Sequence, residues 1–225
     1  MRYPPQKEQF CERCVLPLFA IVDYGVGNLF SLQCSLTAIG IEAEVTGDAN
    51  RLERASHIIL PGVGAFGDAI QKLRASGLEE PVKQLAKAGK PLLGICLGMQ
   101  LLFEHSDEFG EHPGLCLVPG NIVSMQAALD KRELNYKVPQ IGWNSLDIVD
   151  SVSPIMKYSR ADDWVYYVHS YYATDCENSL VASSDYGVQV PGVVQNANVY
   201  GTQFHPEKSG AAGLRIVKAF AEVEP

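Results

Sequence analysis

Short apolar runs alternate with amphipathic stretches along the first half of the chain. A short apolar run bounded by polar turns is typical of a strand buried on both faces of a sheet. Apolar side chains that recur every three or four residues predict a helix packed by one face. The expected strands are residues 18–22, 41–46, 57–60 and 91–95, and the expected helices are 29–40, 68–88 with a break near Gly77, and 97–105. This alternation predicts a parallel sheet covered by helices on both faces.

After Gly110 the pattern changes to short apolar segments separated by turns. The expected strands are residues 115–118, 122–125, 145–149, 164–172, 180–184, 193–196 and 199–204, and a last helix spans 212–221. We therefore expect an α/β fold with an open, mixed and mostly parallel sheet flanked by helices, to which the second half adds antiparallel strands. Residues 18–225 are expected to form a single domain. Residues 1–17 have no apolar period and are expected to form a mobile tail.

Composition limits the possible binding partners of the protein and its cellular compartment. The 225 residues carry a formal net charge of −8, which argues against nucleic-acid and membrane partners, because these need a basic face. The six cysteines form no regular framework. The polar N-terminus has Pro4 and Pro5 where a signal peptide would have an apolar run. Together these features predict a reducing, cytoplasmic location.

A cysteine lies where a buried strand turns directly into a helix, in the sequence Gly-Ile-Cys-Leu-Gly at residues 94–98. Small residues on both sides of Cys96 allow the sharp turn called a nucleophile elbow. The N–H groups of a helix start favour a thiolate, which is the reactive form of cysteine. The N–H of Leu97 would then face the oxyanion of an attacked carbonyl. The frame favours a nucleophile over an inert buried cysteine without excluding the latter.

The sequence Phe-His-Pro-Glu near the C-terminus supplies a base and a carboxylate. Pro206 biases His205 toward an extended conformation, in which residues two apart point the same way. His205 and Glu207 can therefore face one cleft, with the carboxylate orienting the imidazole. An elbow cysteine together with this pair predicts a Cys-His-Glu triad.

A glycine-rich loop at residues 61–67 (PGVGAFG) allows two interpretations. Gly62, Gly64 and Gly67 match the G-x-G-x-x-G pattern of a dinucleotide-binding or regulatory module, which would be no enzyme. That pattern needs an acidic residue at the end of the next strand, where this chain has Cys96. Alternatively, the flexible peptides of the loop turn an N–H into the cleft as a second oxyanion donor. We favour the second interpretation.

These motifs resemble those of class I (triad) glutamine amidotransferases. Four further stretches are similar to the glutaminase subunits of imidazole glycerol phosphate synthases, which act in histidine biosynthesis: residues 23–29 (DYGVGNL), 94–103 (GICLGMQLLF), 165–172 (VYYVHSYY) and 205–209 (HPEKS). The resemblance covers residues 18–221 and implies a flavodoxin-like fold and no cofactor or metal.

The resemblance also implies roles for individual residues. Glutamine would be hydrolysed to glutamate and ammonia through a thioester on Cys96, with His205 as base and then acid and Glu207 orienting it. The amides of Val63 and Leu97 would be the oxyanion donors. The residues implied in substrate binding are Gly62, Gly64, Gln100, Glu108, Ser170 and Tyr171.

The implied partner is a (β/α)₈-barrel cyclase in a heterodimer, to which ammonia would be channelled to make imidazole glycerol phosphate and an aminoimidazole carboxamide ribotide. The residues implied to face it are Asn28, Gln140, Trp143, Tyr166 and Lys208. Gln140 stands where the family usually has a histidine, and related subunit pairs serve sugar amidation in surface-polysaccharide synthesis. That acceptor pathway is therefore the alternative for the same glutaminase chemistry.

Overall fold

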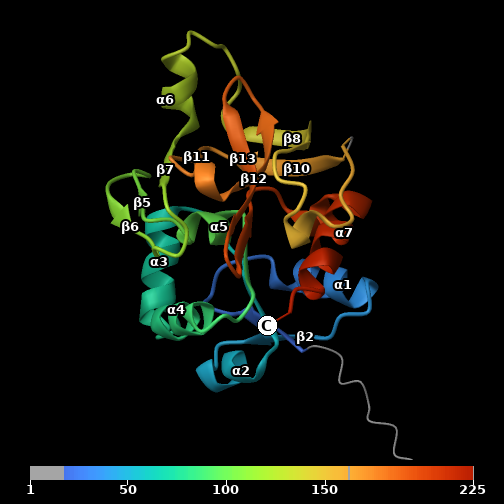
Figure 1. Ribbon diagram of the computed structural model, residues 1–225. Coiled ribbons are helices and arrows are strands. Elements are labelled where there is room, and N and C mark those ends of the chain that lie inside the picture. The colour runs from blue at the N-terminus through green and yellow to red at the C-terminus, as the bar shows by residue number, and fades with distance from the viewer. Residues whose placement is uncertain (1–17, 162, 225) are drawn as a thin grey trace, which may run out of the picture.

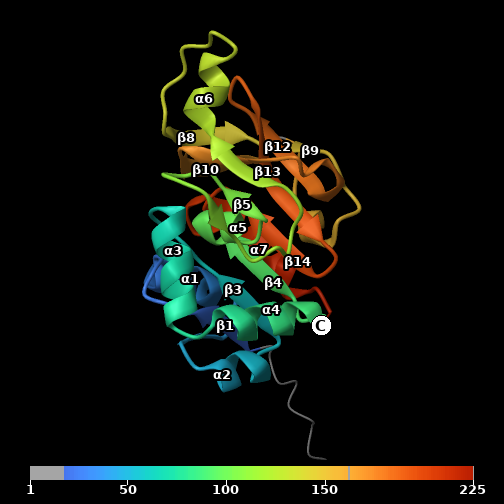
Figure 2. The same ribbon diagram turned by 90° about the vertical axis from the view of Figure 1, so that its left-hand side faces the viewer.

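The computed structural model describes residues 18–161 and 163–224 (Figures 1 and 2). The predicted tail, with Cys11 and Cys14, lies outside these residues. An eight-stranded sheet has the order β2-β1-β3-β4-β14-β13-β12-β9. Its strands are β1 (Phe19–Val22), β2 (Ala43–Thr46), β3 (His57–Leu60), β4 (Leu92–Ile95), β9 (Asp147–Ile148), β12 (Leu180–Asp185), β13 (Gln189–Asn196) and β14 (Val199–Thr202). The five strands from β2 to β14 are parallel, and the other three pair antiparallel.

Helices cover both faces of this sheet (Figure 2). The α-helices of the described residues are α1 (Leu29–Ala38), α2 (Ala49–Arg54), α3 (Phe66–Ala75), α4 (Glu79–Lys87), α5 (Leu97–Leu101), α6 (Met125–Asp130), which lies at the upper end of the molecule in Figure 1, and α7 (Gly210–Ala221). Successive side chains of β1 point to opposite faces. Phe19 and Ile21 pack in a core with residues of α1 and α7. Ala20 and Val22 pack in a second core with residues of α2, α3 and α4.

Two smaller sheets lie beside the upper part of the main sheet in Figure 1, at about the height of β12 and β13. One pairs β8 (Gln140–Ser145) with β10 (Trp164–His169), and the other has the order β11-β7-β5-β6, with β5 (His105–Ser106), β6 (His112–Pro113), β7 (Asn121–Ser124) and β11 (Tyr171–Thr174). Three short 3₁₀ turns complete the described elements: η1 (Pro154–Met156), η2 (Glu177–Ser179) and η3 (Pro206–Lys208). The predicted mixed, mostly parallel sheet with added antiparallel strands is confirmed.

Two expectations near the elbow are wrong. Residues 115–118 are not a strand, and the helix that begins at Leu97 ends at Leu101 instead of residue 105. One cause explains both, because the N–H groups of Leu115 and Leu117 donate to the carbonyls of Leu101 and Leu102 at 2.8 Å. Leu115, Leu117 and Val118 are buried at the end of α5, and the N–H groups of the segment satisfy the carbonyls there, so the segment needs no strand partner.

Other boundaries also differ from the sequence pattern. Residues 145–149 were expected as a strand, but β8 and β9 replace it on either side of Leu146. The expected strand 164–172 is divided at Ser170, whose carbonyl accepts a hydrogen bond from Met125 N at 3.0 Å. The short helices α2 and α6 were not expected, because neither is long enough to show a helical apolar period.

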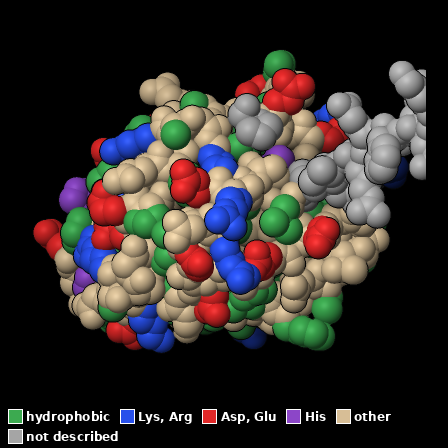
Figure 3. Space-filling model, turned by 90° about the horizontal axis from the view of Figure 1, so that it is seen from below, with side chains coloured by type: hydrophobic (Ala, Val, Ile, Leu, Met, Phe, Trp, Pro, Cys, Tyr) green, Lys and Arg blue, Asp and Glu red, His purple; other side chains and the backbone are tan. Residues whose placement is uncertain are grey.

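The surface shows no segregation of charge on the face seen in Figure 3, where Lys and Arg side chains are interspersed with Asp and Glu. Within residues 18–161 and 163–224, no helix is both long enough and apolar enough to cross a membrane.

Candidate active site

Cys96 lies between β4 and α5 in a strained backbone conformation, with φ 54° and ψ −113°. This is the sharp turn that the flanking glycines predict. A Cβ on Gly98 would lie 1.9 Å from Leu60 O, and one on Gly94 would lie 2.7 Å from Met99 Cα. Glycine at both positions is therefore a steric requirement of the elbow. Since α5 has only five residues, its dipole is weak and other groups must support a thiolate.

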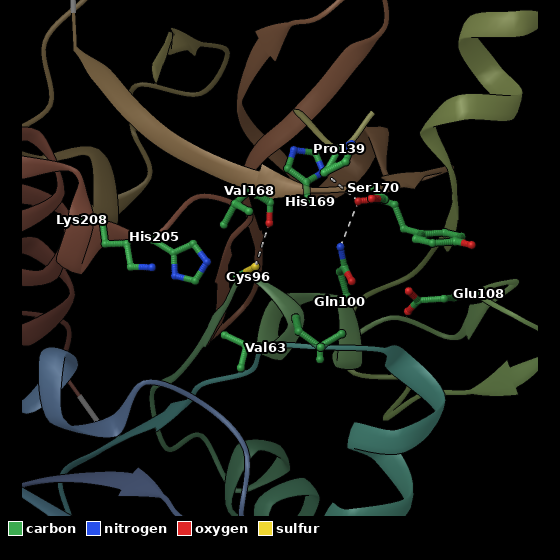
Figure 4. Close-up of a pocket in the computed structure, with 13 residues that line it drawn as sticks. Val63, Cys96, Gln100, Glu108, Pro139, Val168, His169, Ser170, His205 and Lys208 are labelled. Carbon is green, nitrogen blue, oxygen red and sulfur yellow. Dashed lines mark hydrogen bonds between the residues drawn. The ribbon is translucent and has the colours of Figure 1, made fainter. Parts of the chain in front are cut away.

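His205 and Glu207 form the other half of the predicted triad. His205 Nδ1 lies 2.8 Å from Glu207 Oε1, and both side chains are 4% exposed. The backbone of Tyr166 holds this segment, because its carbonyl accepts from His205 N at 3.0 Å and its N–H donates to Ser209 Oγ at 2.9 Å. One nitrogen of the His205 ring faces Cys96 (Figure 4). The three side chains thus meet at the ends of β4 and β14.

The surroundings of His205 favour the charged imidazole. Burial lowers the pKa of His205, but hydrogen bonding and attraction to Cys96 and Glu207 more than offset it and raise the pKa to about 9. His205 is therefore protonated at neutral pH, where it can stabilise a thiolate on Cys96 and donate a proton to a leaving group.

A pocket of about 400 Å³ opens in front of the sulfur of Cys96. Its lining residues are Val63, Gly64, Cys96, Leu97, Gln100, Glu108, Pro139, Val168, His169, Ser170, Tyr171, His205 and Lys208 (Figure 4). The structure thus brings together, from distant parts of the chain, the predicted catalytic residues Cys96 and His205, both predicted oxyanion donors and most predicted substrate-binding residues. Gly62 lines a small adjoining cavity with Asn28, His205 and Glu207.

The glycine-rich loop packs against the elbow from β3. A Cβ on Gly62 would lie 2.6 Å from Gly98 N, and Gly64 has φ +100°. Tyr24 anchors the loop by donating its hydroxyl to Pro61 O at 2.7 Å. Within the described part of the chain, the N–H groups of Val63 and Leu97 donate to no protein acceptor. Neither group is thus used by the hydrogen bonds of the described fold.

Two polar side chains shape the far end of the pocket. Gln100 Nε2 donates to Tyr171 O and to Gln203 Oε1, each at 3.0 Å. Glu108 accepts from Phe66 N at 2.6 Å, at the start of α3. Burial raises the pKa of Glu108 despite this bond. The carboxylate is thus placed to meet a cationic group at the pocket wall, such as the ammonium of an amino acid.

The motifs left three pocket residues unassigned: Pro139, Val168 and His169. His169 Nδ1 donates to Tyr171 O at 2.8 Å, and burial lowers the pKa of this histidine to about 4. It is therefore a neutral wall residue. The apolar and polar alternation of a strand at residues 164–169 puts His169 on one of two faces, which is the only sequence signal for this residue. The pairing of β10 with β8 decides that this face is the one that lines the pocket.

Most residues expected to face a partner are accessible. Asn28 and Lys208 are exposed, and Trp143 is 52% exposed, with its ring centroid 6.0 Å from that of Tyr166. Gln140 departs from this expectation, because its side chain is only 2% exposed. It pairs with His169 across β8 and β10, and successive residues of a strand point to opposite faces. Gln140 thus points inward, whereas Ile141 and Trp143 lie on the opposite face of β8 and are exposed.

The sharp-turn cysteine, the His–Glu pair and the mixed sheet together define a class of amidotransferase, and the chain belongs to the glutamine amidotransferase class-I family, whose pattern matches residues 20–222. It is 44% identical over 206 residues to the protein named imidazole glycerol phosphate synthase subunit HisH of Listeria monocytogenes serotype 4a (strain HCC23), covering 92% of this chain and 96% of that one. The subunit of the same name from Lactiplantibacillus plantarum (strain ATCC BAA-793 / NCIMB 8826 / WCFS1) is 46% identical over the same coverage.

Solved structures agree on the fold. A crystal structure titled glutamine amidotransferase superposes with a TM-score of 0.69 at 19% identity, over 91% of this chain and 99% of that one. PurLQS from Thermotoga maritima gives a TM-score of 0.68 at 19% identity, over 91% and 97% of the two chains.

Proposed function

We infer that this chain is the glutaminase subunit of an imidazole glycerol phosphate synthase. The observation that carries the inference is that Cys96 and His205 line one pocket while Glu207 contacts His205 Nδ1, in a chain 44–46% identical to the HisH subunits over almost its whole length. The same identity favours histidine biosynthesis over surface-polysaccharide synthesis. A thiol nucleophile must stay reduced, which fits the cytoplasm.

The geometry supports a two-step hydrolysis of L-glutamine. The Cys96 thiolate attacks the side-chain amide carbon, and the oxyanion of the tetrahedral intermediate takes the N–H groups of Val63 and Leu97. The imidazolium of His205 gives its proton to the departing nitrogen, so ammonia leaves and a γ-glutamyl thioester remains. Neutral His205 then takes a proton from water, whose oxygen attacks the thioester and releases glutamate. Glu207 holds the imidazole in orientation throughout.

The rest of the pocket is proposed to bind the substrate's amino-acid end. Glu108 would attract the ammonium group, and Gly64, Gln100 and the Ser170–Tyr171 backbone would hold the remaining polar atoms. Gly62 would support the loop that carries Val63, since it packs directly on the elbow.

The partner is proposed to be a (β/α)₈-barrel cyclase that receives the ammonia. Its docking face would be the exposed side of β8 and β10, where Ile141, Trp143 and Trp164 are 62%, 52% and 55% exposed. Large apolar side chains gathered on one face mark a protein interface. Lys208 and Asn28 would extend this face beside the catalytic pocket. A closed route between the subunits would keep ammonia from protonation in water.

The test is glutamate release by the purified chain with and without barrel cyclases. A cyclase of histidine biosynthesis from the same source should stimulate hydrolysis, and a cyclase partner of a sugar amidotransferase should not. Stimulation by the second protein alone would move the chain to polysaccharide synthesis, and no hydrolysis with either would refute the glutaminase assignment.

A further inference from the structure

One buried polar side chain beside Cys96 has no role in the reaction described above. Gln203 follows β14, two residues before His205, and is 0% exposed. Its backbone N–H donates to Gly192 O at 2.9 Å. Directly before it, Thr202 O accepts from Cys96 N at 2.7 Å, so the backbone ties this position to the nucleophile. A buried amide is costly unless its polar atoms are used.

Both ends of the Gln203 amide contact residues of the pocket. Its Oε1 accepts from Gln100 Nε2 at 3.0 Å, and its Nε2 donates to Cys96 Sγ at 3.9 Å. The bond to Gln100 fixes which end of the Gln203 amide faces the sulfur. Gln100 Nε2 can only donate, so Gln203 must present its oxygen to Gln100 and its NH₂ group to the sulfur.

The contacts continue along the wall of the pocket. Gln100 Nε2 also donates to Tyr171 O, which accepts from His169 Nδ1 as well. Gln203 is therefore the junction between the sulfur and the side chains that line the substrate end. A donor aimed at sulfur stabilises the thiolate more than the thiol, since hydrogen bonds to a charged acceptor are stronger.

We propose that Gln203 is a positioning residue that holds an N–H toward the Cys96 sulfur and fixes Gln100 for glutamine. The second part of this role rests on the proposed glutaminase function, whereas the first does not. If Gln203 only filled space, an apolar side chain of the same length would replace it without chemical consequence.

Gln203→Met removes both polar contacts at similar volume. The first measurement is the rate of Cys96 alkylation by iodoacetamide against pH, without glutamine, followed on the Cys96 peptide by mass spectrometry. The midpoint should move to higher pH by about one unit, because the thiolate loses a donor. The second measurement is glutamine hydrolysis, where kcat should fall and KM should rise, so that kcat/KM drops about tenfold or more.

The matched control is Gln189→Met, an exposed glutamine on β13 whose side chain bonds to Ser183 Oγ. It should leave both measurements unchanged. Should Gln203→Met fail to fold, Gln203→Asn keeps an amide that is one methylene too short to span Gln100 and Cys96, and the same shifts are expected. An unchanged midpoint and kcat/KM within twofold of wild type, in a folded Gln203 variant, would overturn the proposal. A shifted midpoint in a chain without glutaminase activity would refute the proposed function and keep only the first part of this role, the N–H that Gln203 holds toward the Cys96 sulfur.

Discussion

Glu207 Oε1 lies 2.8 Å from His205 Nδ1, and the two side chains are equally withdrawn from solvent at 4% exposed. The sequence separation of two residues alone does not produce this contact. It depends on His205 having an extended backbone, with φ −94° and ψ 99°, before the turn η3 brings the carboxylate back to the ring. The ring is thereby fixed in one orientation, with Nδ1–H toward Glu207, and this contact also selects the tautomer of the neutral imidazole that forms during the reaction.

Glu207→Gln should lower glutaminase kcat by about 10²–10⁴-fold, since the amide neither stabilises the imidazolium nor fixes its tautomer. Removing the carboxylate should also lower the pKa of His205 from about 9, so the imidazolium is lost at lower pH. The alkaline limb of the kcat/KM profile should therefore move to lower pH. Glu177→Gln, at an exposed position, is the control. An unchanged alkaline limb would contradict the proposed pairing.

Cys96→Ala should reduce glutamine hydrolysis at least about a thousandfold, because alanine has no thiol to attack the amide carbon and form the thioester. The partner's reaction with added ammonium salt should persist, since only the ammonia source is lost. Glutamate release and ammonia-dependent product formation measure the two effects. Cys34→Ala, an exposed cysteine on α1, should retain both activities. Glutamine use by the Cys96 variant would show that another residue is the nucleophile.

His169 should make the protein less stable in acid. Its pKa is about 4 in the folded chain and near 6.5 when unfolded, so the unfolded state binds the extra proton between these values. The free energy of unfolding is therefore unaffected by His169 protonation above pH 6.5, and it declines by about 3 kcal/mol as the pH falls to 4. Denaturant unfolding of wild type and His169→Leu at pH 6.5 and pH 4 measures how much of the free energy of unfolding depends on the protonation of His169. The variant should lose about that much of the pH dependence, and an unchanged pH dependence would contradict the lowered pKa of His169.

Gly98→Ala should destabilise the fold by more than Gly77→Ala. A Cβ at Gly98 would lie 1.9 Å from Leu60 O, so β3 and α5 would have to separate. Gly77 has φ +75° with open space around it, and alanine there costs only about 1–2 kcal/mol of backbone strain. Thermal unfolding of both variants makes the comparison. Equal losses would mean that the elbow can relax around an added methyl group.

Trp143→Ala should weaken binding of the cyclase at least about tenfold, as expected for a large aromatic at the centre of an interface. The thermal stability of the isolated chain should change little, because half of this side chain is already in solvent. Titration calorimetry measures the affinity. Val152→Ala, 88% exposed beside the cavity near η1, is the control. Equal affinities for wild type and Trp143→Ala would place the docking face elsewhere.

Sequence pattern by itself was enough for the parallel half of the sheet, for the longer helices α1, α3, α4 and α7, and for the three chemical motifs. Apolar runs and helical periods are local properties, and the Gly-x-Cys-x-Gly and His-Pro-Glu motifs consist of neighbouring residues, so each can be recognised without knowledge of distant contacts. Only the tertiary structure decided how β8 pairs with β10, and therefore that Gln140 and His169 point inward while Trp143 points out. Strand alternation leaves the choice of face open until a partner strand sets the register. The contact of Gln203 with Cys96, 107 residues apart, likewise exists because β14 lies beside β4.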